Sequence, residues 1–119
     1  MKTFRYILSR GPQDEPIVTV QNAATRQTWP LDPDQSWKLF KHSPDGFEWG
    51  YDGSGPAQLA LAMLADYFGH CDILPTLALQ FYQNFKRQFI ATAPHNGAVI
   101  TQDQIDTFLD TFISDETHT

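Results

Sequence analysis

The feature that most constrains this chain is the apolar run at residues 56–68, which follows a glycine-rich corner. Projected at about 100° per residue, large apolar side chains cover the whole circumference except one narrow arc. That arc holds Gln58, Ala62, Ala65 and Asp66. A helix that is apolar over most of its circumference packs against neighbours on several sides. The run therefore predicts a central, buried helix, and Gly69 suits the residue just beyond its end.

A tight corner leads into this helix. The tetrapeptide Asp52-Gly53-Ser54-Gly55 has no apolar side chain, and its glycines tolerate positive φ. Pro56 suits the first helical position, where its missing N–H is not needed. We expect Ser54 or Gly55 to cap the helix and the glycines to serve mainly to fold the chain back.

Four segments have the two-residue alternation or the β-branched composition of strands. They are residues 2–8, 17–20, 37–41 and 47–51. Polar turns at 11–16 and 43–46 join them in pairs, which predicts two antiparallel hairpins. The stretch between the pairs, residues 21–36, is expected to be a loop anchored by Trp29.

Two further helices are expected after the central one. The first is capped by Asp72 and ends near Ala91. Its apolar face is formed by Leu74, Leu77, Ala78, Phe81, Phe85 and Phe89. A turn at 94–97 and a short strand at 98–100 follow. The second helix starts at a capping box, in which Thr101 is the cap and Gln104 reaches back to it.

These elements predict a single α+β domain over residues 1–119, with one hydrophobic core. An antiparallel meander of about four strands packs on the central helix, and two further helices complete the fold. Strands are expected mostly in residues 1–51 and helices mostly in 52–113, with a frayed tail at 114–119.

Composition narrows the classes of partner and compartment. The formal net charge is −6, which argues against direct binding of nucleic acid, because phosphate neutralisation needs clustered Lys and Arg. A protein partner remains compatible. The single cysteine, Cys71, cannot form an internal disulfide, which favours a reducing, cytoplasmic setting. Arg5 interrupts the early apolar run, and 59–68 is too short to span a bilayer, so we expect neither a signal peptide nor a membrane segment.

A long motif runs through the corner: residues 42–51 read HSPDGFEWGY and residues 53–62 read GSGPAQLALA. It resembles the core of a family of small proteins of unknown function found in bacteria, archaea and their phages and plasmids. The likeness covers residues 37–90 and extends more weakly to both ends. Relatives often carry a glycine where this chain has Asp52. The resemblance implies no particular activity, and its occurrence on mobile elements implies a host-modulating role.

The corner itself offers one candidate chemistry. Free N–H groups at Gly53-Ser54-Gly55, together with the helix dipole, could bind a phosphate, a nucleotide or another anion. No P-loop pattern is present, no lysine lies nearby in the sequence, and Asp52 would repel an anion. The alternative interpretation, that the glycines only bend the chain, is favoured.

Catalytic, metal and cofactor sites are not indicated. Glu48, Asp52 and Asp66 are close in sequence, but the pattern places them in solvent rather than in an apolar cleft. Ser54 has no base except His42 across the second hairpin. The remaining histidines and Cys71 lack zinc-ligand spacing. We therefore expect no enzymatic activity, no metal and no cofactor.

A surface patch is the more credible site. If Leu39 faces the core, Phe40 faces solvent, where Trp29 or Trp37 would extend it into an aromatic patch of the kind that marks partner surfaces. Glu48, Gly50, Asp52 and Gln58 should surround the mouth of the corner. The predicted function is protein–protein binding by a small acidic accessory protein, in a host or nucleic-acid-handling complex. The predicted site residues are Phe40, Glu48, Asp52, Gly53, Ser54 and Gly55.

Overall fold

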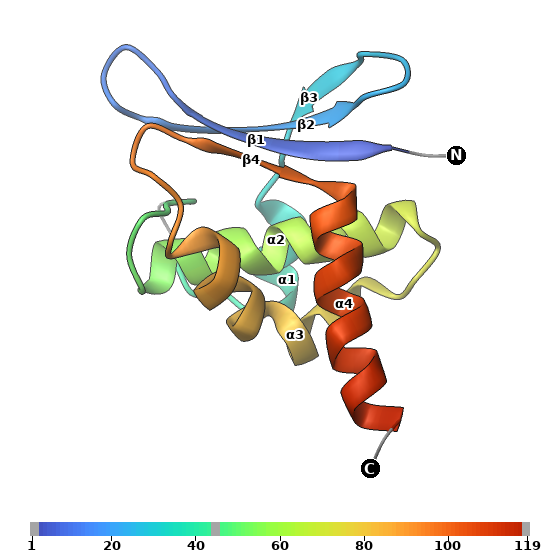
Figure 1. Ribbon diagram of the computed structural model, residues 1–119. Coiled ribbons are helices and arrows are strands. Elements are labelled where there is room, and N and C mark those ends of the chain that lie inside the picture. Colours follow the sequence, from blue (N-terminus) through green and yellow to red (C-terminus); the bar gives the residue numbers. More distant parts are fainter. Residues whose placement is uncertain (1–2, 44–45, 118–119) are drawn as a thin grey trace.

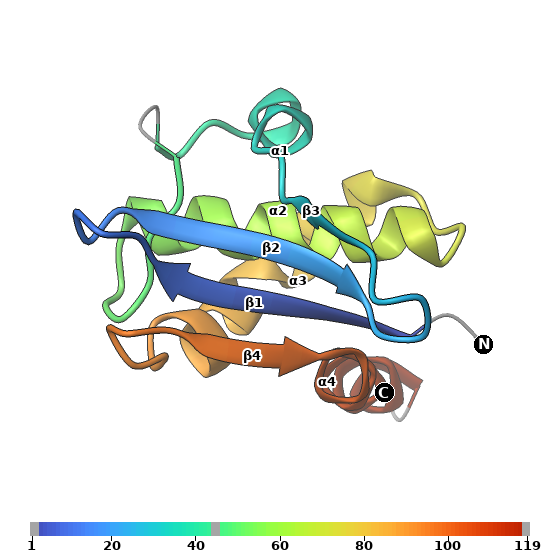
Figure 2. The same cartoon turned by 90° about the horizontal axis from the view of Figure 1, so that it is seen from above.

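A four-stranded antiparallel sheet covers one side of a helical layer in the computed structural model, which describes residues 3–43 and 46–117 (Figure 1). The strands are β1 (Phe4–Arg10), β2 (Pro16–Asn22), β3 (Thr28–Pro30) and β4 (Ala98–Thr101). Their order is β3-β2-β1-β4, and they lie across the long helix α2 (Ser54–His70) when seen from above (Figure 2). The predicted α+β class with four antiparallel strands is confirmed.

The first hairpin is confirmed, with Tyr6 opposite Val20 in the register. Alternate residues of β1 and β2 point to the helices, and Tyr6 and Val20 are fully buried. The last strand, β4, pairs with β1 on its other side. Gly97 makes this approach possible, because a Cβ at Gly97 would lie 2.0 Å from the Leu8 carbonyl oxygen. Gly97 also closes the predicted turn, with its N–H donating to the Pro94 carbonyl and φ at +133°.

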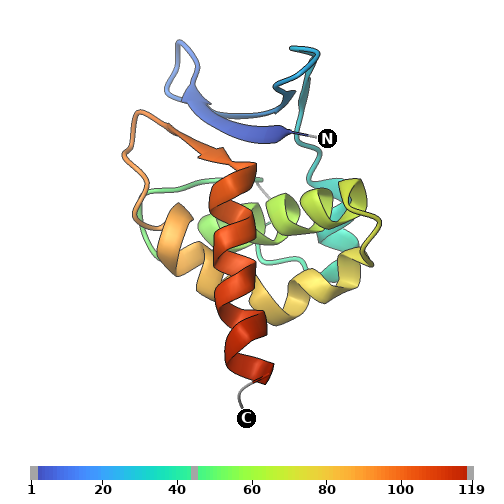
Figure 3. The same cartoon turned by 45° about the vertical axis from the view of Figure 1, so that its right-hand side comes forward.

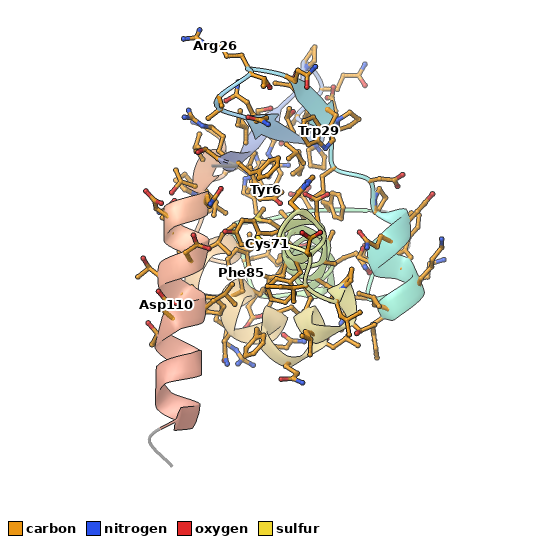
Figure 4. All side chains as sticks on the ribbon, turned by 90° about the vertical axis from the view of Figure 1, so that its right-hand side faces the viewer. Tyr6, Arg26, Trp29, Cys71, Phe85 and Asp110 are labelled. Atoms are coloured by element: carbon orange, nitrogen blue, oxygen red, sulfur yellow. The ribbon has the colours of Figure 1, made fainter. Side chains whose placement is uncertain are left out.

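Helix α2 is the buried centre of the molecule. Seen end-on, it has the sheet above it, α4 on one side, α3 below and α1 on the other side (Figure 4). Leu61 and Leu64 are both fully buried, which confirms the predicted central helix. Three of the four residues of the narrow arc, Gln58, Ala62 and Ala65, are buried as well, and Asp66 is half-buried.

The end of α2 differs from the prediction. Gly69 lies inside the helix, which continues to His70. The turn that closes it is made by Cys71, whose N–H donates to the Phe68 and Tyr67 carbonyls, and by Ile73, whose N–H also donates to Phe68.

The predicted second hairpin is wrong. Residues 37–41 fall mostly in the short helix α1 (Asp34–Leu39), and residues 47–51 form no strand. Gly50 explains the second result, because its φ of +90° and its N–H bond to the Ile90 carbonyl are incompatible with a sheet ladder. The strand that completes the meander is instead β3, within the expected loop, and Trp29 lies on it. The predicted turn at 43–46 depends on Pro44 and Asp45, which lie outside the described residues.

The second predicted helix has three parts. A 3₁₀ turn η1 (Pro75–Leu77) leads into α3 (Ala78–Phe85), and a π-helical turn η2 (Lys86–Ile90) ends it close to the predicted Ala91. Asp72 is not its cap, since it adopts a positive φ of 59° within the preceding loop. Four of the six predicted apolar-face residues face the core, since Ala78 and Phe85 are buried and Phe81 and Phe89 pack against it. The other two are exposed, Leu74 at 70% and Leu77 at 37%. The burial of Tyr82, Lys86 and Ile90 was not predicted.

The final helix, α4 (Gln102–Thr117), runs down one side of the molecule and extends beyond the other helices (Figure 3). The predicted capping box is confirmed, with Thr101 N–H donating to Gln104 Oε1 at 2.9 Å and Gln104 N–H to Thr101 Oγ1 at 3.2 Å. The predicted frayed tail is still helical as far as Thr117, and residues 118–119 lie outside the described part. Along the two described stretches, no helix is both long enough and apolar enough to cross a membrane.

Candidate functional site

The glycine corner allows the segment before α2 to pack closely against the start of the helix. Helix α2 starts after Gly53, which is the N-cap, so the predicted caps Ser54 and Gly55 are not the capping residues. Gly53 is extended at φ −168° and needs no left-handed conformation. A Cβ at Gly55 would lie 2.8 Å from the Cβ of Glu48. This glycine therefore lets the segment before the helix lie directly against its first turn.

A charged cluster fixes that segment from the sheet side. Arg10 forms an ion pair with Glu48 through two contacts, Nη2–Oε1 at 2.8 Å and Nη1–Oε2 at 3.1 Å. The Arg10 guanidinium also stacks over the Trp49 ring, 4.0 Å from its centre. Trp49 is buried and donates its indole N–H to the Pro94 carbonyl. Glu48 points away from the core as predicted, but it is paired rather than merely solvated.

A second charged pair, between Lys86 and Asp52, holds the segment before α2 against the helices. Lys86, on the π-helical turn, is only 7% exposed, and its ammonium lies 2.5 Å from a carboxylate oxygen of Asp52. The hydrogen bond and the positive charge of Lys86 lower the pKa of Asp52. The fold thus brings a lysine to the corner that the sequence places far away.

A histidine and a tyrosine lie beside this pair. His42 Nε2 and Tyr82 Oη are 2.6 Å apart, and the His42 ring stacks on Phe40 with centroids 4.3 Å apart. Burial lowers the pKa of His42, and the charge of Lys86 lowers it further. His42 is therefore engaged with Tyr82, and it is not the base for Ser54 that the sequence left open.

Gln58 holds the loop that carries Phe40 and His42. Its Oε1 accepts from the N–H groups of His42 at 2.6 Å and Ser43 at 3.0 Å. Its Nε2 donates to Ser36 Oγ at 2.9 Å and to the Phe40 carbonyl at 3.1 Å. Gln58 thus links α2 to the α1 segment through buried hydrogen bonds. The prediction that it lies at the mouth of the corner is wrong.

A hollow of about 340 Å³ opens beside the start of α2. It is lined by Pro16, Ser43, Gly46, Phe47, Glu48, Tyr51, Ser54 and Gly55. Tyr51, which lines the hollow, is 51% exposed, and Phe40, three residues before the lining residue Ser43, is 53% exposed. We call the hollow, together with the segment that carries Phe40, the α2-start face.

The six predicted site residues separate into three groups. Glu48, Ser54 and Gly55 line the hollow together. Gly53 and Asp52 lie next to it, with Asp52 turned to Lys86. Phe40 is exposed as expected, but Trp29 does not extend its patch, because Trp29 packs against Phe4 and His70.

Sequence reasoning missed Arg10, Lys86 and Tyr82, which organise this face. All three come from elements far from residues 40–55 in the chain, so no local spacing signals their approach. Only Lys86 left a trace in the sequence, as a charged residue one position after Phe85, which belongs to the predicted apolar face.

In the described parts of the chain, no group of three or more His, Cys, Asp or Glu side chains is arranged to hold a metal ion.

Asp66, predicted to be solvated, is half-buried and accepts a 2.7 Å hydrogen bond from Tyr6 Oη.

The pattern of a family described as a family of unknown function (DUF6166) matches residues 10–111. Neither a curated protein nor a solved structure matches the chain.

Proposed function

We propose that this chain, which belongs to the DUF6166 family of unknown function, is a small accessory protein that binds another protein through its α2-start face. The observation that carries the proposal is a hollow of about 340 Å³ lined by Tyr51, which is 51% exposed, next to the segment that carries Phe40, which is 53% exposed. Exposed aromatic side chains next to a concave surface are typical anchors of protein interfaces.

The rigidity of the face supports this function. The Phe40 carbonyl is held by Gln58, and its ring stacks on His42. A face that is already ordered loses little conformational entropy on binding, which favours affinity. An aromatic ring on a flexible loop would lose more conformational entropy on binding.

The charges of the face indicate the kind of partner. Glu48 and Asp52 are each paired internally, yet the Asp52 side chain remains 61% exposed. With a net charge of −6, the protein favours a partner surface that is neutral or basic. A host protein, or a protein within a nucleic-acid-handling complex, fits this description, whereas direct contact with nucleic acid does not.

An anionic ligand at Gly53-Ser54-Gly55 is the alternative function. Ser54 and Gly55 line the hollow, and they belong to the first turn of α2, where N–H groups have no partner within the helix. The carboxylates of Glu48 and Asp52 flank the same place and oppose an anion. For this reason we rank anion binding second.

Affinity capture with matched variants tests the first function. Wild type, the double variant Phe40→Ala/Tyr51→Ala and the control Val99→Ala would each be used to capture proteins from a lysate of the source cells. Val99 is 49% exposed but lies on β4, away from the α2-start face. We expect a protein that wild type and the control retain and the double variant loses. Equal retention by all three would contradict the proposal.

Thermal shift with inorganic phosphate and nucleotides tests the alternative. A rise in melting temperature that Ser54→Pro removes would favour the anion site over the protein interface. A flat response across these compounds would exclude it.

A further inference from the structure

An apolar groove lies at the opposite end of α2, between α3 and α4. Its volume is about 260 Å³, and it is lined by Phe68, Ile73, Leu77, Gln80, Phe81 and Leu109. Figure 4 faces this end of the molecule, with Cys71 marking the close of α2. A groove of this size accommodates one or two bulky apolar side chains.

Exposed apolar side chains are concentrated in the segment that contributes Ile73 and Leu77 to the groove. Ile73, Leu74, Leu77 and Leu79 are 39%, 70%, 37% and 41% exposed, and they account for half of the large hydrophobic side chains exposed in the described residues. They fall within seven consecutive positions, 73–79. Single exposed apolar residues are ordinary, but a contiguous group beside a groove is typical of an interaction surface.

Acidic residues adjoin the groove residues in the chain. Asp72 precedes Ile73, and Asp106 and Asp110 flank Leu109 on α4. Asp72 and Asp110 are exposed, and Asp106 accepts a hydrogen bond from Tyr67 Oη. The chain has no Lys or Arg after Arg87. The C-terminal end of α2, which carries the negative end of the helix dipole, also lies here.

We propose that this groove binds a basic amphipathic segment of another protein, which inserts a bulky apolar side chain and places Lys or Arg beside it. The apolar lining favours the anchor, and the acidic surroundings favour the flanking cations. A second copy of this chain would bring the same aspartates against one another, which like-charge repulsion opposes. An anionic membrane is opposed for the same reason.

This surface is separate from the α2-start face, so its test does not depend on the function proposed above. The probe is a synthetic amphipathic helix of leucine and lysine, with the leucines at helical spacing and a fluorophore for anisotropy. One matched peptide has glutamate in place of lysine, and another has alanine in place of leucine. We expect both to bind at least about tenfold more weakly than the leucine–lysine peptide.

Protein variants locate the binding. Leu77→Lys places a positive charge in the groove at a side chain that is already 37% exposed, so the fold should be kept. We expect it to weaken peptide binding about tenfold or more. Methyl resonances of Ile73, Leu77 and Leu109 in the wild-type protein should shift on titration, which reports the site directly.

A charge-matched pair of variants tests the role of the aspartates. Asp72→Asn/Asp110→Asn should weaken binding about fivefold at low ionic strength and less at high salt. Asn suits the positive φ of residue 72, so the loop is not strained. The control Asp32→Asn/Asp34→Asn removes the same charge near α1 and should change the affinity less than about twofold.

Several outcomes would overturn the proposal. They are equal affinity for the glutamate peptide, methyl shifts confined to other residues, and binding that Leu77→Lys leaves unchanged. A concentration-dependent dimer in sedimentation that Leu77→Lys abolishes would assign the groove to a second copy. Binding to phosphatidylserine vesicles instead of the peptide would assign it to a membrane.

Discussion

Gln58 is a buried amide in a helix whose other buried side chains are almost all apolar. It has no exposed surface, and it makes four hydrogen bonds to the α1 segment and the loop that follows it. A buried polar side chain is tolerated when its hydrogen-bonding groups are satisfied, as they are here. The amide therefore gives α2 a directional contact with this segment, which packing of leucines alone would not supply.

Replacement of Gln58 by leucine should destabilise the protein. The volume is nearly conserved, but the N–H groups of His42 and Ser43 lose their acceptor and the Phe40 carbonyl loses its donor. We expect Gln58→Leu to lower the free energy of unfolding by about 3 kcal/mol. Urea denaturation followed by circular dichroism measures this change. Gln35→Leu, on the exposed side of α1, is the control and should stay within about 0.5 kcal/mol of wild type.

The Lys86–Asp52 pair is unequal, because Lys86 is nearly buried and Asp52 is mostly exposed. Without the carboxylate, the positive charge of Lys86 would be buried with no opposite charge beside it. Without the ammonium, the carboxylate of Asp52 would still be solvated by water. Lys86 lowers the pKa of Asp52, so the folded protein binds that proton less readily than the unfolded chain. The stabilisation is present above the ordinary pKa of aspartic acid and is lost as the pH falls through the lower folded-state pKa.

Asp52→Asn should therefore be destabilising at neutral pH, and the difference from wild type should close as the pH is lowered through the acid range. Urea unfolding at a series of pH values measures this difference. In the background of Lys86→Met, which keeps an apolar stem of similar length, Asp52→Asn should have almost no effect at any pH. A gap between wild type and Asp52→Asn that stays constant down to strongly acidic pH would contradict this explanation.

At the scale of the element, α2 contains two glycines with opposite roles. A Cβ at Gly55 would lie 2.8 Å from Glu48 Cβ, whereas a Cβ at Gly69 would meet nothing within 4 Å. Neither residue requires a positive φ. The helix therefore offers a matched pair, in which the same substitution meets crowding at one end and open space at the other.

Gly69→Ala should stabilise the protein by about 0.5–1 kcal/mol, because alanine is the better helix former and restricts the unfolded chain. Gly55→Ala should destabilise it by about 1 kcal/mol, because the displacement of Glu48 outweighs that gain. Thermal or urea unfolding of both variants measures the two signs. If both variants were stabilised, the corner would not be the close-packed contact described here.

The elements predictable from the sequence are those with strong local signals. The apolar helix, the first hairpin and the Thr101 capping box are each specified by residues within one segment, and all three are confirmed. Residues 37–40 were misassigned because an apolar–polar alternation over so few residues fits a helical turn as well as a strand. The buried Ser36 stabilises the helix, because its hydroxyl donates to the Pro33 carbonyl and accepts from Gln58 Nε2.

The candidate site was less predictable than the fold, for a related reason. The glycine corner is visible in the sequence because it belongs to the motif, and Phe40 because it is an aromatic residue placed on the outer side of a predicted strand. The residues that hold this region, Arg10, Tyr82 and Lys86, come from β1, α3 and η2. Gly50 shows the same limit: the alternation of Phe47, Trp49 and Tyr51 indicates a strand, and only the distant Ile90 carbonyl accounts for the glycine between them. Contacts of this range leave no pattern in one sequence.

At the scale of the whole molecule, α2 separates two surfaces of different character. The helix has 17 residues, which at about 1.5 Å per residue is about 26 Å. The exposed rings and charged pairs lie at its start, and the apolar groove with its aspartates lies at its end. If both proposed surfaces bind their partners, this chain of 119 residues would hold the two proteins at opposite ends of α2.

The two surfaces should act independently, because they lie at opposite ends of α2, whose side chains are buried along most of its length. The double variant Phe40→Ala/Tyr51→Ala should therefore bind the leucine–lysine peptide within about twofold of wild type, as expected for distant sites. Leu77→Lys should likewise leave retention of the lysate partner unchanged. Fluorescence anisotropy and affinity capture on the same set of variants measure both. Loss of peptide binding in the first variant, with its unfolding curve unaltered, would mean that α2 couples its two ends, and the protein would then be a switch rather than a bridge.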